Sequence, residues 1–179
     1  MNMRPADIFL ISVTGKDRVG VVSAVTNYLF ETGANLADCA YAVLGEGFEF
    51  TCVAEFSAGT TREEIETGVA AIELLEGARI TVSRFPFEVS RGETSEITHV
   101  VEVKGGDRPG LVAQLSEVLV DYDANIVRMS SRRTVIEGQR YDYRTRFAVN
   151  ISPERFTALE AALYNTAGSL RLECQVTEV

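Results

Sequence analysis

The sequence has few of the residues from which enzymes build catalytic and metal sites. Its 179 residues include a single histidine, and its three cysteines are isolated from one another. A nucleophile with its base, or a structural zinc site, needs several such groups together. We therefore expect no catalytic residue, no metal site, no cofactor and no enzymatic activity. An odd number of cysteines cannot form a complete disulfide framework, which favours the reducing cytoplasm.

Long apolar runs and excess positive charge are also missing. No run approaches the roughly 18 apolar residues that cross a bilayer, and the N-terminal residues show no signal-peptide pattern, so we expect no membrane association. Residues 1–90 carry 6 Lys/Arg against 13 Asp/Glu, residues 91–179 carry 11 against 13, and the net charge is −9. Nucleic-acid affinity depends on cations that neutralise phosphates. We therefore expect no direct nucleic-acid binding, and any role in gene control would run through another protein.

The most informative pattern is a repeat with a spacing of 90 residues. The tetrapeptide Asp-Arg-x-Gly occurs at 17–20 and again at 107–110, and Asn35 recurs as Asn125 at the same spacing. Two matches in one register indicate a duplicated unit. The polar stretch 88–96 is the natural linker, so we predict a first domain over 1–90 and a second over 91–179.

Each half shows the same series of predicted elements. A short apolar run predicts a buried strand, an amphipathic stretch predicts a helix, and two further apolar runs around a glycine turn predict a hairpin. A second helix and a last strand complete the order βαββαβ. In the first half these elements fall at 7–15, 19–33, 34–56 with its turn at 45–47, 60–77 with a Thr N-cap, and 78–87. In the second half they fall at 96–105, 108–123, 125–151 with its turn at 137–138, 152–168 with Ser152 as N-cap, and 169–179.

The hairpin strands alternate between an apolar and a polar face, as in the Phe48–Phe56 segment. A strand pattern with one polar face indicates an antiparallel sheet that is covered on one side only. The order βαββαβ is the ferredoxin-like arrangement, with both helices on the covered side. We therefore predict an α+β fold of two tandem ferredoxin-like units, with eight strands and four helices. The predicted core includes Ile11, Val25, Leu29, Phe50, Leu115, Leu119, Phe147 and Leu163.

The repeated tetrapeptide lies where a strand turns into a helix. The first amides of a helix are unpaired, and the positive end of its dipole favours anions. Glycine lets a ligand approach the backbone closely, so a carboxylate could be held there without a catalytic side chain. The alternative is that Asp17 and Asp107 cap the helices, while Gly20 and Gly110 permit close packing.

The paired asparagines strengthen the ligand interpretation. Asn35 and Asn125 follow the first helix of each half and open the next strand, and we expect this position to lie beside the loop before the helix. Asparagine offers a donor and an acceptor, which suits a zwitterionic amino acid. A lone asparagine here could be an ordinary turn residue. Both features together, twice at one spacing, favour a binding site.

On these residues the chain resembles the ACT domains, small βαββαβ modules that bind amino acids and regulate metabolism. The shared pattern is a strand, "DRVG" or "DRPG", a helix, "GAN" or "DAN", and a hairpin, and two tandem copies of it cover nearly the whole chain. A free-standing pair most resembles the glycine cleavage system transcriptional repressor group. The resemblance implies a ligand between paired ACT domains, contacted by the loop of one and the asparagine region of its neighbour. The residues carried over are Asp17, Arg18, Val19, Gly20, Asn35, Asp107, Arg108, Pro109, Gly110 and Asn125.

The resemblance also implies the kind of ligand and partner. A small amino acid such as glycine or serine is expected, together with a homodimer and a transcription regulator or metabolic enzyme as protein partner. Two alternatives remain open: a regulatory subunit of a separate metabolic enzyme, and a dimerisation module without a ligand. Val19 stands where the second loop has Pro109, and Asp123 stands where the first half has Gly33, so the two sites are expected to differ in affinity.

Two features lie outside the repeated motif. His99 shares a strand face with Val101 and Val103 and corresponds to Phe9, so we expect a packed histidine. A basic cluster comprises Arg128, Arg132, Arg133, Arg140, Arg144 and Arg146. Alternation places at least Arg140, Arg144 and Arg146 on the open sheet face. One interpretation is a solvated face partly paired with Asp142 and Glu137; the other is a docking surface for an acidic partner or for the acidic first domain.

Overall fold

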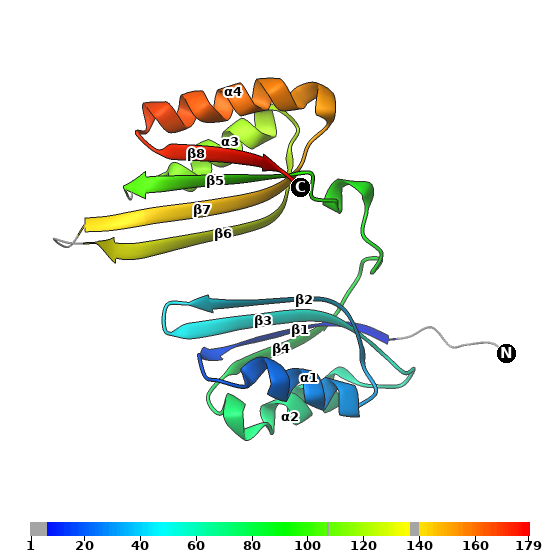
Figure 1. Ribbon diagram of the computed structural model, residues 1–179. Coiled ribbons are helices and arrows are strands. Elements are labelled where there is room, and N and C mark those ends of the chain that lie inside the picture. The colour runs from blue at the N-terminus through cyan, green and yellow to red at the C-terminus, as the bar shows by residue number, and fades with distance from the viewer. Residues whose placement is uncertain (1–6, 107, 137–139) are drawn as a thin grey trace. The chain divides into compact units, whose positions relative to one another are not determined.

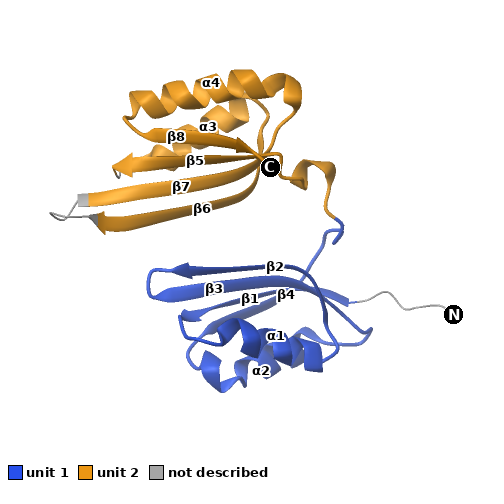
Figure 2. Ribbon diagram, in the orientation of Figure 1, with its two compact units in different colours: residues 1–90 blue, residues 91–179 orange. Residues whose placement is uncertain are grey.

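The computed structural model describes residues 7–106, 108–136 and 140–179. The chain divides into two compact units, unit 1 with residues 1–90 and unit 2 with residues 91–179 (Figure 2). Each unit is a four-stranded antiparallel sheet with two helices on one face (Figure 1). The prediction of two ferredoxin-like βαββαβ units is therefore confirmed.

The strands follow the same spatial order in both units, β2-β3-β1-β4 in unit 1 and β6-β7-β5-β8 in unit 2. The third strand of each unit therefore lies between the second and the first. Unit 1 comprises β1 (Asp7–Lys16), α1 (Val21–Glu31), β2 (Asn35–Leu44), β3 (Gly47–Phe56), α2 (Arg62–Ala70) and β4 (Arg79–Arg84). Unit 2 comprises β5 (His99–Gly106), α3 (Leu111–Asp121), β6 (Asn125–Ile136), β7 (Arg140–Asn150), α4 (Pro153–Ser169) and β8 (Glu173–Glu178).

The apolar strand faces pack beneath the helices. Phe50 of β3 and Phe147 of β7 are both buried, and the residues on either side of them in each strand face away from the helices. All eight residues predicted for the core are buried. Alternation therefore identified the covered face of each sheet, because a period of two can bury only one set of side chains.

The second helix of unit 1 is shorter than the pattern predicted. Thr61 is its N-cap, as expected, and its hydroxyl accepts a hydrogen bond from the Glu64 amide. The helix ends at Ala70, and the chain continues in a 3-10 turn over Glu73–Leu75 that buries the Leu75 side chain. The sequence after Ala70 therefore does not continue the α-helix that its apolar spacing predicted, and the 3-10 turn places Leu75 in the core instead. In unit 2 the corresponding helix runs unbroken from Ser152, its N-cap residue, as predicted.

The glycine turn between β2 and β3 lies at Gly45 and Glu46, as the hairpin pattern predicted. Gly45 has φ 63°, a left-handed conformation that suits glycine. The turn predicted at 137–138 in unit 2 lies outside the described residues. Among the helices that the structure describes, none is long and apolar enough to cross a membrane.

Candidate functional site

Both Asp-Arg-x-Gly motifs form the turn between the first strand and the first helix of their unit. Gly20 has φ 96° and Gly110 has φ 81°. Other residues pay a steric cost in this left-handed region, which explains glycine at both positions. In each loop the amide after the glycine bonds back to the carbonyl of the arginine. The backbones of the two loops are therefore alike wherever both are described.

Asp17 does not cap helix α1. Its carboxylate accepts a hydrogen bond of 2.6 Å from the hydroxyl of Tyr41 on β2, so the capping interpretation is wrong for this residue. Asp107 lies outside the described residues. Glycine at the N-cap of α1 and of α3 provides no side-chain bond to the first amides. The positive end of each helix dipole is thus left to attract an anion.

The loop of unit 2 borders a small cavity. Its volume is about 150 Å³, roughly that of five water molecules at about 30 Å³ each. Tyr143, on β7, pairs with Gly105 just before the loop and brings a phenolic ring to the cavity. The lining residues are Arg108, Gly110, Leu111, Val112, Ala113 and Tyr143. The cavity is thus lined by the uncapped N-terminus of α3 together with an arginine and a tyrosine.

Sequence reasoning missed Tyr143 as a site residue. Alternation places it on the helix-facing side of its strand, but only the pairing of the first strand with the third brings it beside the loop. The second hairpin is longer than the first, so equivalent residues of the third strands are no longer 90 positions apart and the repeat does not align Tyr143 with Phe48. The available signal was an aromatic residue at the start of the third strand in both halves, Phe48 and Tyr143.

The surroundings of the loop differ in unit 1. Phe48 pairs with Gly15 and so occupies the position of Tyr143. Tyr41, a second residue that sequence reasoning missed, stacks on Phe48 with ring centroids 5.9 Å apart and reaches Asp17. The hydrogen bond to Asp17 raises the pKa of the Tyr41 hydroxyl. The edge strand is therefore bonded to the loop of unit 1.

The two asparagines lie at the opposite end of their unit from the loop. Strands β1 and β2 both run antiparallel to β3, where Lys16 pairs with Gly47 and Asn35 pairs with Glu55. At about 3.3 Å per residue, roughly 26 Å of β3 separates the two pairs. The expectation that Asn35 adjoins its own loop is therefore wrong, and the register of β6 gives the same result for Asn125. The loop precedes the first helix and the asparagine follows it, so the helix separates them.

Each asparagine instead bonds to its own unit at the start of an edge strand. The amide nitrogen of Asn35 donates to a carboxylate oxygen of Glu55 at 3.0 Å. The amide nitrogen of Asn125 donates to the carbonyl oxygen of Thr94 at 2.7 Å. Neither side chain is buried, so a group from outside the unit can still reach both.

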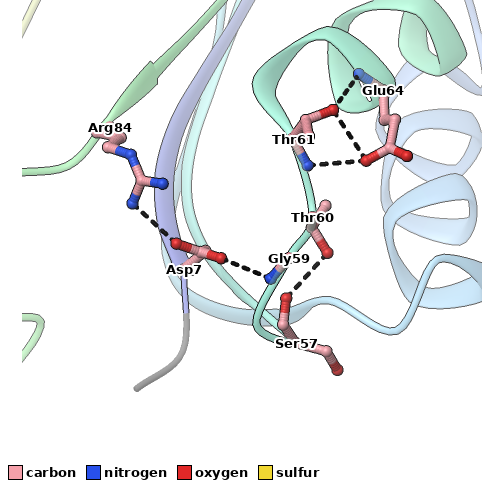
Figure 3. Close-up of polar contacts among 7 residues, drawn as sticks. All are labelled: Asp7, Ser57, Gly59, Thr60, Thr61, Glu64 and Arg84. Atoms are coloured by element: carbon pink, nitrogen blue, oxygen red, sulfur yellow. Dashed lines mark hydrogen bonds and ion pairs between the residues drawn. The ribbon is translucent and has the colours of Figure 1, made fainter. Parts of the chain in front are cut away.

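A larger groove of about 500 Å³ lies between β4 and the start of α2 in unit 1. Its polar groups bond to one another (Figure 3). Asp7 accepts a hydrogen bond of 3.0 Å from the Gly59 amide and one of 2.8 Å from Arg84. Thr61 and Glu64 cap α2 reciprocally. Unlike α1 and α3, this helix already has a side-chain partner for its N-terminal amides, so the groove is the weaker candidate for anion binding.

His99 is a packed residue, as predicted. Its side chain is buried, and its ring stacks on Phe156 with centroids 4.0 Å apart. Its Nδ1 atom lies 3.0 Å from the Thr98 hydroxyl. The side chain is therefore fixed within unit 2 by a ring contact and a polar neighbour.

Known proteins share both the sequence pattern and the fold. Residues 7–73 match one family profile described as the ACT domain, and residues 99–163 match another with the same description. No curated protein matches the chain in sequence.

Among the crystal structures that match, two align with this chain over nearly their full length. One, of an unknown protein from Galdieria sulphuraria, has a TM-score of 0.75 and 23% identity, covering 97% of this chain and 99% of that one. The other, of a candidate glycine cleavage system transcriptional repressor, has a TM-score of 0.64 and 17% identity, covering 97% and 98%. At these identities the likeness shows a shared fold.

Proposed function

Because the chain belongs to the ACT-domain family, with one such domain in each unit, we propose that it senses a small free amino acid and regulates metabolism without catalysing a reaction. The observation that carries the proposal is the cavity of about 150 Å³ at the uncapped N-terminus of α3. Pockets for larger, drug-sized ligands typically measure about 300 Å³ or more. The size favours glycine or serine.

The cavity supplies complementary groups for such a ligand. The first amides of α3 and the guanidinium of Arg108 would hold the carboxylate, as helix N-termini hold anions. The Tyr143 hydroxyl would donate a further hydrogen bond. Close approach to the backbone requires the missing side chain of Gly110. In unit 1 the residues in the same role are Arg18, Val19 and Gly20.

The amino group requires a second contact, which we assign to an asparagine of another copy of the chain. Asn125 lies too far from the loop of its own unit. Antiparallel pairing of two β6 edge strands would bring the start of one beside the end of the other, where the loop lies. A homodimer would then complete the site, and ligand binding would stabilise the dimer.

The proposed process is control of glycine or one-carbon metabolism, or of its transcription, through protein contact. The full-length structural likeness to a candidate glycine cleavage system transcriptional repressor supports this choice. The acidic chain, with a net charge of −9, makes a protein partner the more plausible route than direct DNA contact.

Thermal unfolding in the presence of each of the twenty amino acids tests the proposal. A ligand that binds only the folded state stabilises it by RT ln(1 + [L]/Kd), about 2.7 kcal/mol at a hundredfold excess over Kd. Ala113→Leu should abolish the shift by filling the cavity of unit 2. Ser23→Leu, the same change at the corresponding position of α1, is the matched control. Asn125→Ala should weaken binding about five- to hundredfold, since a lost buried hydrogen-bond partner costs roughly 1–3 kcal/mol.

The alternative functions give different results. If no amino acid shifts the unfolding temperature at millimolar concentration, the sensor proposal fails and a dimerisation module takes its place. If the protein instead co-purifies with a metabolic enzyme in equal amounts, it is a regulatory subunit of that enzyme. If Ala113→Leu leaves the shift intact and Ser23→Leu abolishes it, the ligand binds at the first loop.

A further inference from the structure

The open face of the sheet in unit 2 carries a row of arginines. Thr145 and Phe147 of β7 are buried on the helix-covered side, so the residues between and beside them face the other way. This places Arg144 and Arg146 on the open face. The pairing of β6 with β7 adds Arg128 and Arg132, opposite Ala148 and Arg144 respectively. All four arginines are exposed.

These arginines are incompletely neutralised. Arg144 donates to a carboxylate oxygen of Glu102 at 2.6 Å, and this bond raises the pKa of the guanidinium further. Within the described residues no ion pair joins Arg128, Arg132 or Arg146 to an acidic group. Arg132 moreover lies directly opposite Arg144. Like charges in directly opposed positions destabilise a sheet.

The fold itself does not require arginine at these positions. By strand register, Arg132, Arg144 and Arg146 correspond in unit 1 to Ala42, Glu49 and Thr51. The same sheet is therefore built without the cluster. The cluster also runs against the composition of a chain whose net charge is −9. A local feature that lowers stability without a structural gain is typical of a functional surface.

We propose that this arginine face, defined by Arg128, Arg132, Arg144 and Arg146, docks an acidic protein segment rich in Asp and Glu. Guanidinium groups offer a planar fork of donors that fits carboxylates in pairs. Four of them on neighbouring strands present a surface for several carboxylates at once. The docking surface goes beyond the proposed amino-acid sensing and does not depend on it.

The chemistry of the face distinguishes an acidic protein from a nucleic acid. Single-stranded nucleic acids bind sheet faces through aromatic side chains on which their bases stack. The aromatic residues of β7 lie on the other side of the sheet. On that side the Arg133 guanidinium carbon lies 4.4 Å from the centre of the Tyr141 ring, in a cation–π contact. The face therefore offers no stacking platform for bases, whereas its guanidinium groups suit the carboxylates of an acidic segment.

Binding of fluorescein-labelled poly-L-glutamate to the full chain at low salt tests the proposal. The double variant Arg132→Glu/Arg146→Glu should bind the probe at least tenfold more weakly than the wild type. The matched control, Arg62→Glu/Arg79→Glu, makes the same change of net charge on unit 1 and should weaken binding less than threefold. Binding to the wild type should also weaken as salt is raised.

Three results would overturn the proposal: no binding of poly-L-glutamate to the wild type, equal weakening in both double variants, or tighter binding of a single-stranded oligothymidine of the same charge. Arg132→Glu also replaces a like-charged pair with an opposite one, so that variant should melt no lower than the wild type. If the charge-reversal variant does not fold, Arg132→Gln/Arg146→Gln replaces it, with an expected weakening of at least threefold.

Discussion

Tyr41 of unit 1 and Ser131 of unit 2 occupy the same position in their sheets but make different contacts. Tyr41 lies opposite Phe50, which pairs with Val13 of the first strand. Ser131 lies opposite Thr145, which pairs with Val103, the repeat partner of Val13. The Tyr41 hydroxyl reaches across to the loop and donates to Asp17. The Ser131 hydroxyl remains within the sheet, 2.9 Å from that of Thr145. In unit 1 this position of the edge strand β2 thus forms a hydrogen bond to the loop before the helix. In unit 2 the equivalent position of β6 bonds to the neighbouring strand.

Where both loops are described they share one backbone feature, a glycine in the left-handed region at the helix N-cap. What differs is the side chains around them, with Tyr143 beside an open cavity in unit 2 and Phe48 beneath Tyr41 in unit 1. The two units therefore share an uncapped helix N-terminus with a left-handed glycine, and they differ in the side chains beside it. We expect unit 2 to bind the amino acid more tightly, which the matched variants Ala113→Leu and Ser23→Leu separate.

The largest expected effect concerns the helices of the two units. A Cβ at Gly68 of α2 would lie 1.7 Å from the Tyr28 hydroxyl of α1, whereas a Cβ at Gly168 of α4 would meet nothing within 4 Å. Gly68→Ala should therefore lower the free energy of unfolding by about 1–3 kcal/mol through overpacking. Gly168→Ala should raise it by up to about 1 kcal/mol through helix propensity. Chemical denaturation and hydrogen exchange, read separately for peptides of each unit, measure both changes.

A rescue variant isolates the cause. Val118 stands at the repeat position of Tyr28, so Tyr28→Val gives unit 1 the residue that unit 2 uses there. The double variant Gly68→Ala/Tyr28→Val should be more stable than the sum of the two single changes predicts, because the clash is gone. Additive effects would show that the Tyr28 ring swings aside and that the close contact is not what selects glycine.

Sequence reasoning predicted most of the fold because each of its signals is local. The strand faces, the Thr61 cap and the hairpin turn at Gly45 all follow from periods and residue types within a few positions. The site required more, since Tyr143 reaches the loop through a pairing between strands about forty residues apart. The wrong prediction for the position of Asn35 has the same cause, a dependence on how the strands pair. The elements around it were predicted correctly, but which end of the sheet it occupies depends on strand direction.

The second expected effect concerns the residue after the first helix of each unit. Gly33 has φ 79° and Asp123 has φ 53°, so both adopt the left-handed conformation, which is costly for residues other than glycine. Gly33→Asp should therefore destabilise unit 1 by about 1 kcal/mol. Asp123→Gly should relieve strain of about that size but lose the ion pair with Arg155, an exposed contact worth roughly 0–1 kcal/mol. Denaturation curves of both variants give the values.

The reciprocal design makes the comparison strict. Both changes exchange the same two residue types at equivalent positions, so propensity alone predicts opposite signs. Arg155→Ala removes the ion pair while leaving Asp123 in place, and it should cost no more than the pair itself. If Asp123→Gly is clearly more destabilising than Arg155→Ala, the side chain of Asp123 has a role beyond that contact, and its contribution to stability outweighs the left-handed strain.

The smallest expected effect is a pH dependence of stability that comes from Asp7 in unit 1. The equivalent position of unit 2 has no titratable side chain. The Gly59 amide, and next the Arg84 guanidinium, lower the pKa of the Asp7 carboxyl (Figure 3). Asp7 corresponds to Ile97, and the place of Arg84 is taken by Glu178. A carboxyl whose pKa is lowered by folding stabilises the fold above its unfolded pKa, about 3.9, and loses this contribution as the pH falls through the folded value.

Asp7→Asn should therefore lower the melting temperature at pH 7. Its difference from the wild type should shrink below about pH 4, where the carboxyl of the unfolded chain takes up a proton while the folded carboxyl stays ionised to a lower pH. Arg84→Met keeps the stronger contact with the Gly59 amide, so its effect at pH 7 should be smaller than that of Asp7→Asn and its residual pH dependence should survive. Melting curves of the three proteins between about pH 2.5 and 7, interpreted with the pKa range of carboxyls, decide the matter. A difference between Asp7→Asn and the wild type that is the same at every pH would show that Asp7 acts by shape alone, and the comparison with Ile97 would then lose its electrostatic basis.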